Sequence, residues 1–181
     1  YSTANLNYLF GTGVDWVRIP FDPTSILNAT SGSASETTQI GYLTAAVDIA
    51  LARGFKVLLD CHVSLTDSGW DAATILADYP AGSHWTRMVA FSATMGAALA
   101  AKNYSPSQVA YQTFNEMPGT QTNYNAKVLA LYNSFRTTNT YTTVVIGGDQ
   151  YSSIDGLRTW TMSGFTGNYL VGVTPYVPQQ F

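Results

Sequence analysis

Residues 55–61 have the sequence FKVLLDC, which is typical of a β-strand buried on both faces. The run is almost continuously apolar, like a parallel strand covered by helices, and does not alternate between apolar and polar residues. On its N-terminal side, Thr37–Arg53 places apolar residues at the 3.6-residue spacing of a helix, and Gly54 ends that helix. On its C-terminal side, Ser83–Lys102 predicts a second helix. A strand between two helices favours a βα repeat on a parallel sheet.

The same alternation of strand and helix extends along the chain. A third long helix is expected over Asn123–Thr137, and Tyr1–Gly11 is expected to be the first helix. The Ser/Thr/Gly-rich stretch Asn28–Thr38 is expected to be a surface loop. Right-handed crossovers would arrange these units as a barrel or as an open sheet. The expected strands are Val14–Pro20, Phe55–Cys61, Val109–Phe114, Thr142–Gly147 and Tyr169–Thr174.

Composition argues against several classes of partner. The 181 residues are enough for one domain with its own core, and residues 1–181 are interpreted as a single domain. Only 10% of residues are charged, the net charge is −3, and Lys and Arg do not cluster, so no nucleic-acid partner is expected. No apolar run approaches the roughly 18 residues that span a membrane. A surface rich in hydroxyl and aromatic groups favours an extracellular, secreted protein that acts on neutral polymers.

Cysteine and histidine are too few to suggest a metal centre. Cys61 is the single cysteine, so no internal disulfide can form, and its place in an apolar strand predicts a buried, unreactive thiol. His62 and His84 are the two histidines, and together with one cysteine they make a metal site improbable. No metal and no cofactor is therefore expected.

Polar residues occur where the predicted strands end. Because the carboxyl ends of parallel strands in a βα barrel meet at one rim, and active sites lie there, these residues are expected to be close together. Packing alone does not account for so many polar groups directly after apolar strands. In chain order they are Arg18, Asp22, Asp60, His62, Asn115, Glu116, Asp149 and Tyr176.

Glu116 is the sharpest candidate for catalysis. The chain has two glutamates, and the other, Glu36, lies in a polar stretch just before a helix, where capping of the helix N-terminus is the expected role. Glu116 follows a buried strand and precedes the turn-forming Pro118-Gly119. A carboxylate at that position costs free energy unless it is hydrogen-bonded or functional. The residues therefore predict a general acid at Glu116, with a structural ion pair as the alternative.

Three segments together resemble glycoside hydrolase family 5, the cellulase-type endoglucanases. Val17-Arg18-Ile19-Pro20, Val57–His62 and Phe114–Pro118 are similar to the second, third and fourth strands of that family, in the same order and at similar spacing. Thr142–Gly148 resembles the fifth strand and Tyr169–Phe181 the sixth. The resemblance implies an α/β fold: a partial (β/α)8 TIM barrel of about five βα units that lacks the first and the last two strands.

The resemblance also implies roles for individual residues. Arg18 would support the nucleophile's carboxylate by a charge-assisted hydrogen bond. His62 would contact the sugar at the cleavage subsite, and Asn115 would bind its 2-hydroxyl. Glu116 would protonate the leaving oxygen and then activate water, while Tyr176 would line the subsite near the nucleophile. From the residues alone, a rim histidine at His62, a barrel salt bridge at Arg18 and simple packing at Tyr176 stay open.

The chain departs from the family pattern in informative places. Thr174 replaces the histidine expected two residues before Tyr176, and Met117 is inserted before the proline of the Asn-Glu-Pro-like motif. The family's nucleophilic glutamate ends the seventh strand, which has no counterpart here. Asp149 is a weak substitute, and Asp60 is expected to stabilise the rim through backbone hydrogen bonds. Either the chain is a fragment, another copy supplies the missing strands, or the gene product is truncated.

These inferences lead to one main hypothesis about function and one alternative. The leading reading is a retaining endo-β-1,4-glucanase, or a piece of one, with a β-glucan oligosaccharide or polysaccharide as its partner. The rival is a carbohydrate-binding remnant that lacks the nucleophile. Trp70 lies in the polar loop after the second strand and is expected to stack on a sugar in the cleft. Self-association through the open sheet edges is a further expectation.

Overall fold

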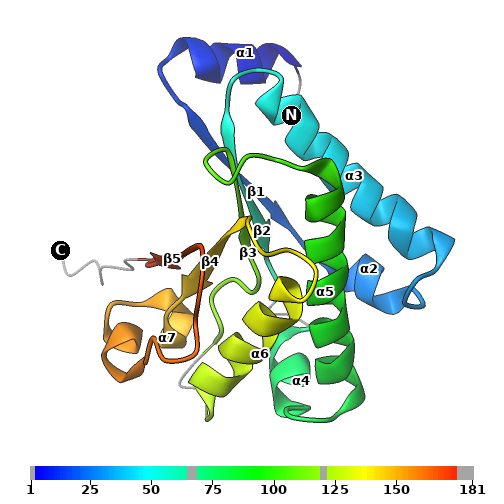
Figure 1. Ribbon diagram of the computed structural model, residues 1–181, viewed down its shortest axis with the longest axis vertical. Coiled ribbons are helices and arrows are strands. Elements are labelled where there is room, and N and C mark those ends of the chain that lie inside the picture. The colour runs from blue at the N-terminus through cyan, green and yellow to red at the C-terminus, as the bar shows by residue number, and fades with distance from the viewer. Residues whose placement is uncertain (1–2, 65–68, 119–121, 175–181) are drawn as a thin grey trace.

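A computed structural model describes residues 3–64, 69–118 and 122–174 of the chain (Figure 1). Five strands in these residues form one sheet with the spatial order β1-β2-β3-β4-β5, and every neighbouring pair is parallel. Because order in space follows order in the chain, each connection crosses over in the same direction, as in a barrel. The strands are β1 (Trp16–Phe21), β2 (Lys56–Cys61), β3 (Val109–Gln112), β4 (Thr143–Gly147) and β5 (Tyr169–Gly172).

Three long helices lie on one side of the sheet and provide its apolar cover (Figure 1). They are α3 (Ala34–Leu51), α5 (Ser83–Lys102) and α6 (Tyr124–Arg136), close to the ranges expected from sequence. The N-terminal helix α1 (Thr3–Gly11) was also expected. The shorter helices were not predicted: α2 (Thr24–Asn28), α4 (Ala72–Ala77), α7 (Asp149–Ser152) and the 3₁₀ helix η1 (Asp155–Thr159). In the described residues no helix is both long and apolar enough to cross a membrane.

The beginning of α3 corrects one sequence expectation. The stretch Asn28–Thr38 was predicted to be a loop, but α3 begins at Ala34. Ser33 is the N-cap and its hydroxyl accepts the Glu36 N–H at 3.2 Å, while the Glu36 carboxylate accepts the Gly32 N–H at 2.6 Å. This reciprocal pattern satisfies N–H groups at the start of a helix. The polar composition therefore marked a helix start, and the predicted capping role of Glu36 is confirmed.

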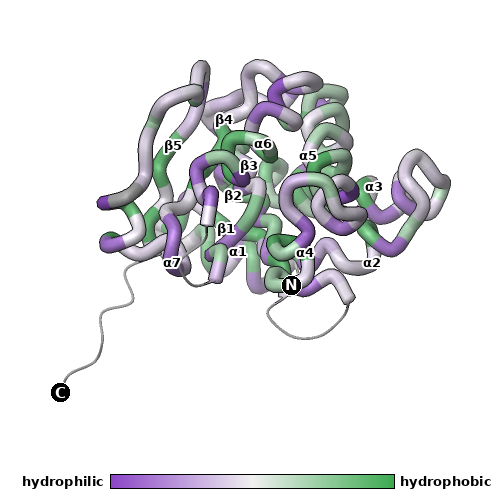
Figure 2. The backbone as a smooth tube through the Cα atoms, turned by 90° about the horizontal axis from the view of Figure 1, so that it is seen from below, coloured by the Kyte–Doolittle hydropathy of each residue, from purple (hydrophilic) through white to green (hydrophobic). Residues whose placement is uncertain are grey.

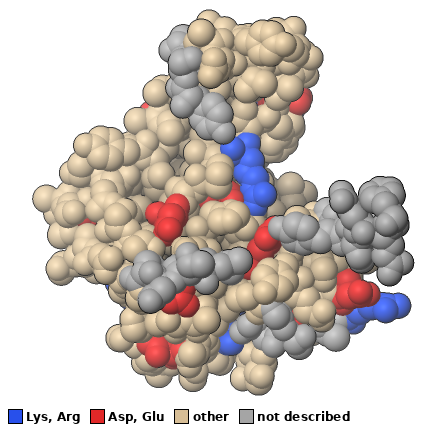
Figure 3. Space-filling model, turned by 180° about the vertical axis from the view of Figure 1, so that it is seen from behind, with Lys and Arg blue, Asp and Glu red and all other residues tan. Residues whose placement is uncertain are grey.

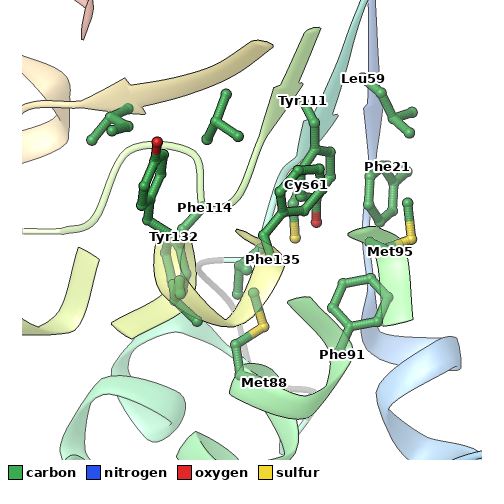
Figure 4. Packing of buried hydrophobic residues seen from close by; sticks show 14 of the residues in the cluster. Phe21, Leu59, Cys61, Met88, Phe91, Met95, Tyr111, Phe114, Tyr132 and Phe135 are labelled. Atoms are coloured by element: carbon green, nitrogen blue, oxygen red, sulfur yellow. The ribbon is translucent and has the colours of Figure 1, made fainter. Parts of the chain in front are cut away.

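The hydrophobic core fills the space between the sheet and the three long helices. Figure 4 shows side chains of β1, β2 and β3 pointing toward α5 and α6, and the Tyr111 ring stacks on Phe135 with centroids 5.1 Å apart. Each such buried apolar side chain contributes about 1.5–3 kcal/mol. Figure 2 shows hydrophobic residues concentrated on the strands and hydrophilic ones on outer turns. The labelled core residues are Phe21, Leu59, Cys61, Met88, Phe91, Met95, Tyr111, Phe114, Tyr132 and Phe135.

The sheet is open in the described part of the chain. Strands β1 and β5 form its two edges, so each has one neighbour among the described residues. Apolar side chains are exposed at both edges: Trp16 is 46% exposed in β1, and Leu170 is 53% exposed in β5. Five parallel strands with alternating helices confirm the prediction of a partial (β/α)8 barrel.

Candidate active site

One face of the sheet collects the polar side chains that end the strands. Successive side chains of a strand point to opposite faces. In β2, Val57, Leu59 and Cys61 are buried in the core beneath the helices, so Asp60 points to the other face. The register pairs Asp60 with Gln112 of β3, which shares that face. Arg18 is directed to it as well, because its β1 neighbours on either side, Val17 and Ile19, pack toward the core.

Four polar side chains, Arg18, Asp60, His62 and Asn115, form a hydrogen-bonded network, and Gln112 joins it through Asn115. Arg18 Nη2 lies 3.0 Å from Asp60 Oδ2 and donates to Asn115 Oδ1 at 2.6 Å. His62 Nδ1 lies 3.2 Å from the same Asp60 Oδ2 and 3.1 Å from Asn115 Nδ2. Gln112 Nε2 also donates to Asn115 Oδ1, at 3.3 Å. The structure thus brings together three predicted site residues from three strands, with Asp60 between two of them.

Glu116 directly follows this network and has an unusual backbone. Its φ is 43°, in the left-handed region of backbone conformation that residues other than glycine and asparagine rarely adopt. Both neighbours are anchored: the Asn115 N–H donates to the Cys61 carbonyl at 2.9 Å, and the Met117 carbonyl accepts the Tyr151 N–H at 2.9 Å. Glu116 is half-buried. Strained backbone that its surroundings hold in place is common at active sites.

Asp60 is the most buried charge of the network. It is 0% exposed, whereas Arg18 and His62 have side-chain exposures of 42% and 49%. Burial raises the pKa of Asp60, and the positive charge of Arg18 and the hydrogen bond from His62 oppose that rise. Within the described residues the Asp60 carboxylate contacts the side chains of Arg18 and His62 and no backbone group. The prediction that Asp60 stabilises the rim through backbone hydrogen bonds was therefore wrong. Side chains on β1 and β2 reach it because they share one face of the sheet.

The other carboxylates at the strand ends are less accessible or already engaged. Asp149 is 3% exposed and its Oδ1 accepts the Gln150 N–H at 2.8 Å. Asp22 is exposed, and its Oδ1 accepts the Thr24 N–H at 2.9 Å at the start of α2. Glu36 is 1% exposed and forms an ion pair with Arg87 at 2.8 Å, away from the strand ends. Glu116 is therefore the half-buried carboxylate that lies beside the network.

The sequence matches the family model described as Cellulase (glycosyl hydrolase family 5) over residues 4–171. The chain belongs to glycosyl hydrolase family 5. The matched span contains Arg18, Asp60, His62, Asn115 and Glu116, so every residue of the network and the adjacent glutamate lie within the family domain. No curated protein sequence matches the chain significantly.

The fold of this family 5 chain is similar to that of several solved structures. An endo-β-1,4-glucanase described as hyperthermophilic and in complex with substrate has a TM-score of 0.74 at 18% identity, over 98% of this chain and 54% of its own. A mutant form of Thermotoga maritima Cel5A in complex with cellobiose has a TM-score of 0.79 at 17% identity, and the match covers 97% of this chain and 53% of that protein. The cellulose synthase subunit Z of Clostridioides difficile has a TM-score of 0.70 at 19% identity, and the match covers 96% of this chain and 53% of that protein. The chain spans about half the length of these proteins.

One of the two remaining predicted site residues of the family 5 chain, Trp70, stands apart from the network. Tyr176 lies outside the described residues. Trp70 lies in the loop after β2, where its Nε1 donates to Asn28 Oδ1 at 2.6 Å and its ring meets His84 edge-on at 4.8 Å. These contacts tie the indole to the ends of α2 and α5. Its stacking on sugar stays a prediction.

The single cysteine of this family 5 domain lies in the core. Cys61 is fully buried, and burial raises the pKa of its thiol well above the usual value, which confirms the predicted buried thiol. Among residues 3–64, 69–118 and 122–174, no group of three His, Cys, Asp or Glu side chains is placed to hold a metal ion. On the face drawn in Figure 3, Lys and Arg side chains lie apart from one another.

Sequence reasoning missed Gln112 and misread Asp60. Gln112 is 5% exposed and ends a strand that is otherwise apolar, apart from the Tyr111 hydroxyl. An amide in a buried strand has to find hydrogen-bond partners, and that requirement was the available signal. For Asp60 the signal was its spacing of two residues from His62, which places both side chains on the same side of the chain.

Proposed function

We propose that this family 5 domain hydrolyses β-1,4-linked glucan by a retaining mechanism in which Glu116 is the general acid. The observation that best supports the proposal is the position of Glu116, which adjoins the Arg18–Asp60–His62–Asn115 network at the carboxyl ends of adjacent parallel strands. Active sites of βα barrels lie at that rim. Cellobiose and mannotriose complexes of Thermotoga maritima Cel5A, a structural neighbour, support a β-linked oligosaccharide as the partner.

The role proposed for each residue follows from the hydrogen-bond donors and acceptors of its side chain. Glu116 would donate its proton to the glycosidic oxygen as the bond to the sugar breaks, and would then take a proton from water. Asn115 has its amide oxygen held by Arg18, so its Nδ2 is the group that can donate to a sugar hydroxyl. A hydrogen bond that strengthens as positive charge develops on the sugar lowers the barrier.

A retaining mechanism needs a second carboxylate about 5–5.5 Å from the first. Asp60 Oδ2 already contacts Arg18 and His62, and Asp149 Oδ1 accepts the Gln150 N–H, so neither carboxylate is assigned as the nucleophile. We therefore propose that the nucleophile comes from polypeptide outside the described residues. Arg18, whose side chain is 42% exposed, would provide the positive charge beside it.

The open edges of the sheet support a proposal of self-association. Unpaired strand edges with exposed apolar side chains bind other strands readily. Leu170 in β5 is 53% exposed and Val171 is 39% exposed. We expect light scattering to give a molar mass above the 19.6 kDa of one chain. Leu170→Lys is expected to shift the protein toward the monomer, and a monomeric wild type would contradict self-association.

Secretion is also part of the proposal. Polysaccharide substrates lie outside cells, and a surface low in charge and rich in hydroxyl groups suits them. The proposal expects the native protein in the culture medium, which immunoblotting of medium and cell fractions tests directly.

Hydrolysis of carboxymethyl cellulose tests the catalytic proposal. Purified wild type should release reducing sugar, and Glu116→Gln should lower the rate by at least about 100-fold. Asp155→Asn is the matched control, because it also removes one carboxylate, from a site 75% exposed, and should leave the rate unchanged. Calorimetry with cellotetraose on the same samples separates binding from turnover. Binding without any release would favour the sugar-binding alternative.

A further inference from the structure

The Asp60 carboxylate is placed unlike a residue that serves stability alone. It is 0% exposed, and within the described residues its Oδ1 has no hydrogen-bond partner. Two contacts, from Arg18 Nη2 and His62 Nδ1, converge on Oδ2 alone. Burying a carboxylate with half of its acceptor capacity unfilled is costly, and an apolar residue of similar volume is often equally stable. A buried charge of this kind calls for a functional reason.

His62 Nδ1 faces two partners that demand opposite protonation states. Asp60 Oδ2, at 3.2 Å, needs Nδ1 to donate a proton, whereas Asn115 Nδ2, at 3.1 Å, needs Nδ1 to accept one. A neutral imidazole carries its proton on one nitrogen, so only one of these hydrogen bonds can exist at a time. The Asn115 NH₂ group has two N–H donors, and the choice of tautomer decides whether the one that faces His62 is held by it or is left for another acceptor.

The orientation of the Asn115 amide is fixed independently of His62. Its Oδ1 accepts from Arg18 Nη2 at 2.6 Å and from Gln112 Nε2 at 3.3 Å. A flipped amide would bring an NH₂ group against the guanidinium, donor against donor. Nδ2 consequently faces His62, and it cannot avoid the conflict at Nδ1 by rotation.

We propose that Asp60 is a positioning residue that holds the His62 proton on Nδ1 and thereby leaves the Asn115 Nδ2 group to bind a sugar hydroxyl. An ionised acceptor makes a hydrogen bond roughly twice as strong as a neutral one, so Asp60 outcompetes Asn115 for Nδ1. Arg18, 3.0 Å from Asp60 Oδ2, favours the ionised carboxylate by opposing the rise that burial causes in its pKa. The inference rests on the proposed function only in taking a sugar hydroxyl as the ligand of Asn115.

The same arrangement prepares His62 for the sugar. With the proton on Nδ1, the other ring nitrogen, Nε2, is an acceptor, and it has no partner among the described residues. The His62 side chain is 49% exposed. Asn115 would then present a donor and His62 an acceptor, a pair suited to neighbouring hydroxyl groups of one sugar.

Nitrogen NMR of the histidine rings tests this inference without any turnover. With ¹⁵N-histidine, long-range ¹H–¹⁵N spectra at about pH 8, where histidine is neutral, show which ring nitrogen carries the proton. The chain has two histidines, and a His84→Gln variant assigns the signals. We expect Nδ1–H for His62 in the wild type and in Asp155→Asn, and Nε2–H in Asp60→Asn. Because Asn115 is then held by His62, the Kd for cellotetraose should rise about tenfold in Asp60→Asn.

An Nε2–H tautomer in the wild type would overturn the proposal, and so would an unchanged tautomer in folded Asp60→Asn. If Asp60→Asn does not fold, the wild-type spectrum alone decides. Full hydrolysis by Glu116→Gln would refute the proposed function and leave the tautomer result standing. Loss of hydrolysis in that variant together with Nε2–H in the wild type would refute only the role of Asp60.

Discussion

The Asn115 N–H donates to the carbonyl of Cys61 at 2.9 Å, beyond the last pair of the β2–β3 ladder, Asp60 with Gln112. This bond holds the chain after β3 against the end of β2. The next residue, Glu116, then turns into a left-handed conformation with φ 43°. The glutamate is therefore placed by backbone constraints on both sides of it.

The left-handed conformation of Glu116 predicts a trade between stability and function. Such a φ costs a residue with a Cβ about 1–2 kcal/mol, and glycine avoids the cost. Glu116→Gly should therefore be more stable than Glu116→Ala by about 1 kcal/mol, although both lack the carboxylate. Urea denaturation of the two variants measures the difference, and an Ala variant as stable as the Gly variant would contradict the strain.

Removal of Arg18 should leave Asp60 as a buried, poorly compensated charge. Arg18→Met is expected to lower the free energy of unfolding by about 2 kcal/mol at neutral pH. Lys56→Met is the control, because Lys56 is 43% exposed and pairs with the 67% exposed Asp15 at 3.6 Å, so its loss should cost no more than about 0.5 kcal/mol. Equal losses in the two variants would contradict a special role for the Arg18–Asp60 pair.

The loss of unfolding free energy caused by Arg18→Met, here called the deficit, should also depend on pH. The pKa of Asp60 is already raised by burial, and the charge of Arg18 is the main effect that opposes the rise. Without Arg18 the pKa rises further. The deficit is then full above that pKa and shrinks as pH falls through it, because the carboxyl becomes neutral. Denaturation curves at several pH values test the sign, and a deficit that grows toward acid pH would contradict it.

Glu36 and Arg87 connect three helices. Their ion pair measures 2.8 Å with side-chain exposures of 2% and 13%, and Arg87 also donates to the Ile26 carbonyl at 2.8 Å. Glu36→Gln leaves the guanidinium without its charge partner and should cost about 3 kcal/mol. Thermal unfolding measures this, with Asp155→Asn, at a 75% exposed site, as the control. A loss below about 0.5 kcal/mol would show that the pair contributes little.

Asp48 links α3 to α5 in a pH-dependent way. Hydrogen bonds from Lys102 at 2.6 Å and from the Tyr104 hydroxyl at 2.7 Å lower the pKa of Asp48. A lowered pKa gives stability that is present above the usual value of 3.8 and is lost as pH falls through the folded-state value. Asp48→Asn should cost about 0.5 kcal/mol at pH 7 and nothing at strongly acid pH. A pH-independent difference would contradict this account.

The long elements could be predicted because their patterns repeat. Ser83–Lys102 shows several turns of helical spacing, and its predicted bounds agree with the structure. The helices α2 and α4 have five and six residues, too few for a periodic pattern to emerge. The N-terminal part of α3 was missed because Ser and Gly were interpreted as loop formers, although Ser33 serves as a cap.

Most residues of the site could be predicted, Gln112 excepted, but the contacts between them could not. Strand ends identified Arg18, His62 and Asn115, because parallel strands end at one rim. That Asp60 lies between Arg18 and His62 depends on which way side chains turn across two strands, and a linear pattern does not specify this. That Asp60 and Asn115 compete for the same ring nitrogen of His62 can be recognised only from the interatomic distances in the structure.

The most direct test of the central claim compares leaving groups in wild type and Glu116→Ala. A general acid is needed when the leaving oxygen is basic and is dispensable when it is a good leaving group. We predict that Glu116→Ala lowers kcat/KM by about 1,000-fold for an unactivated cello-oligosaccharide and by less than about tenfold for 2,4-dinitrophenyl β-cellobioside. Equal losses on both substrates, or no hydrolysis of either by folded wild type, would contradict the assignment of Glu116 as the acid.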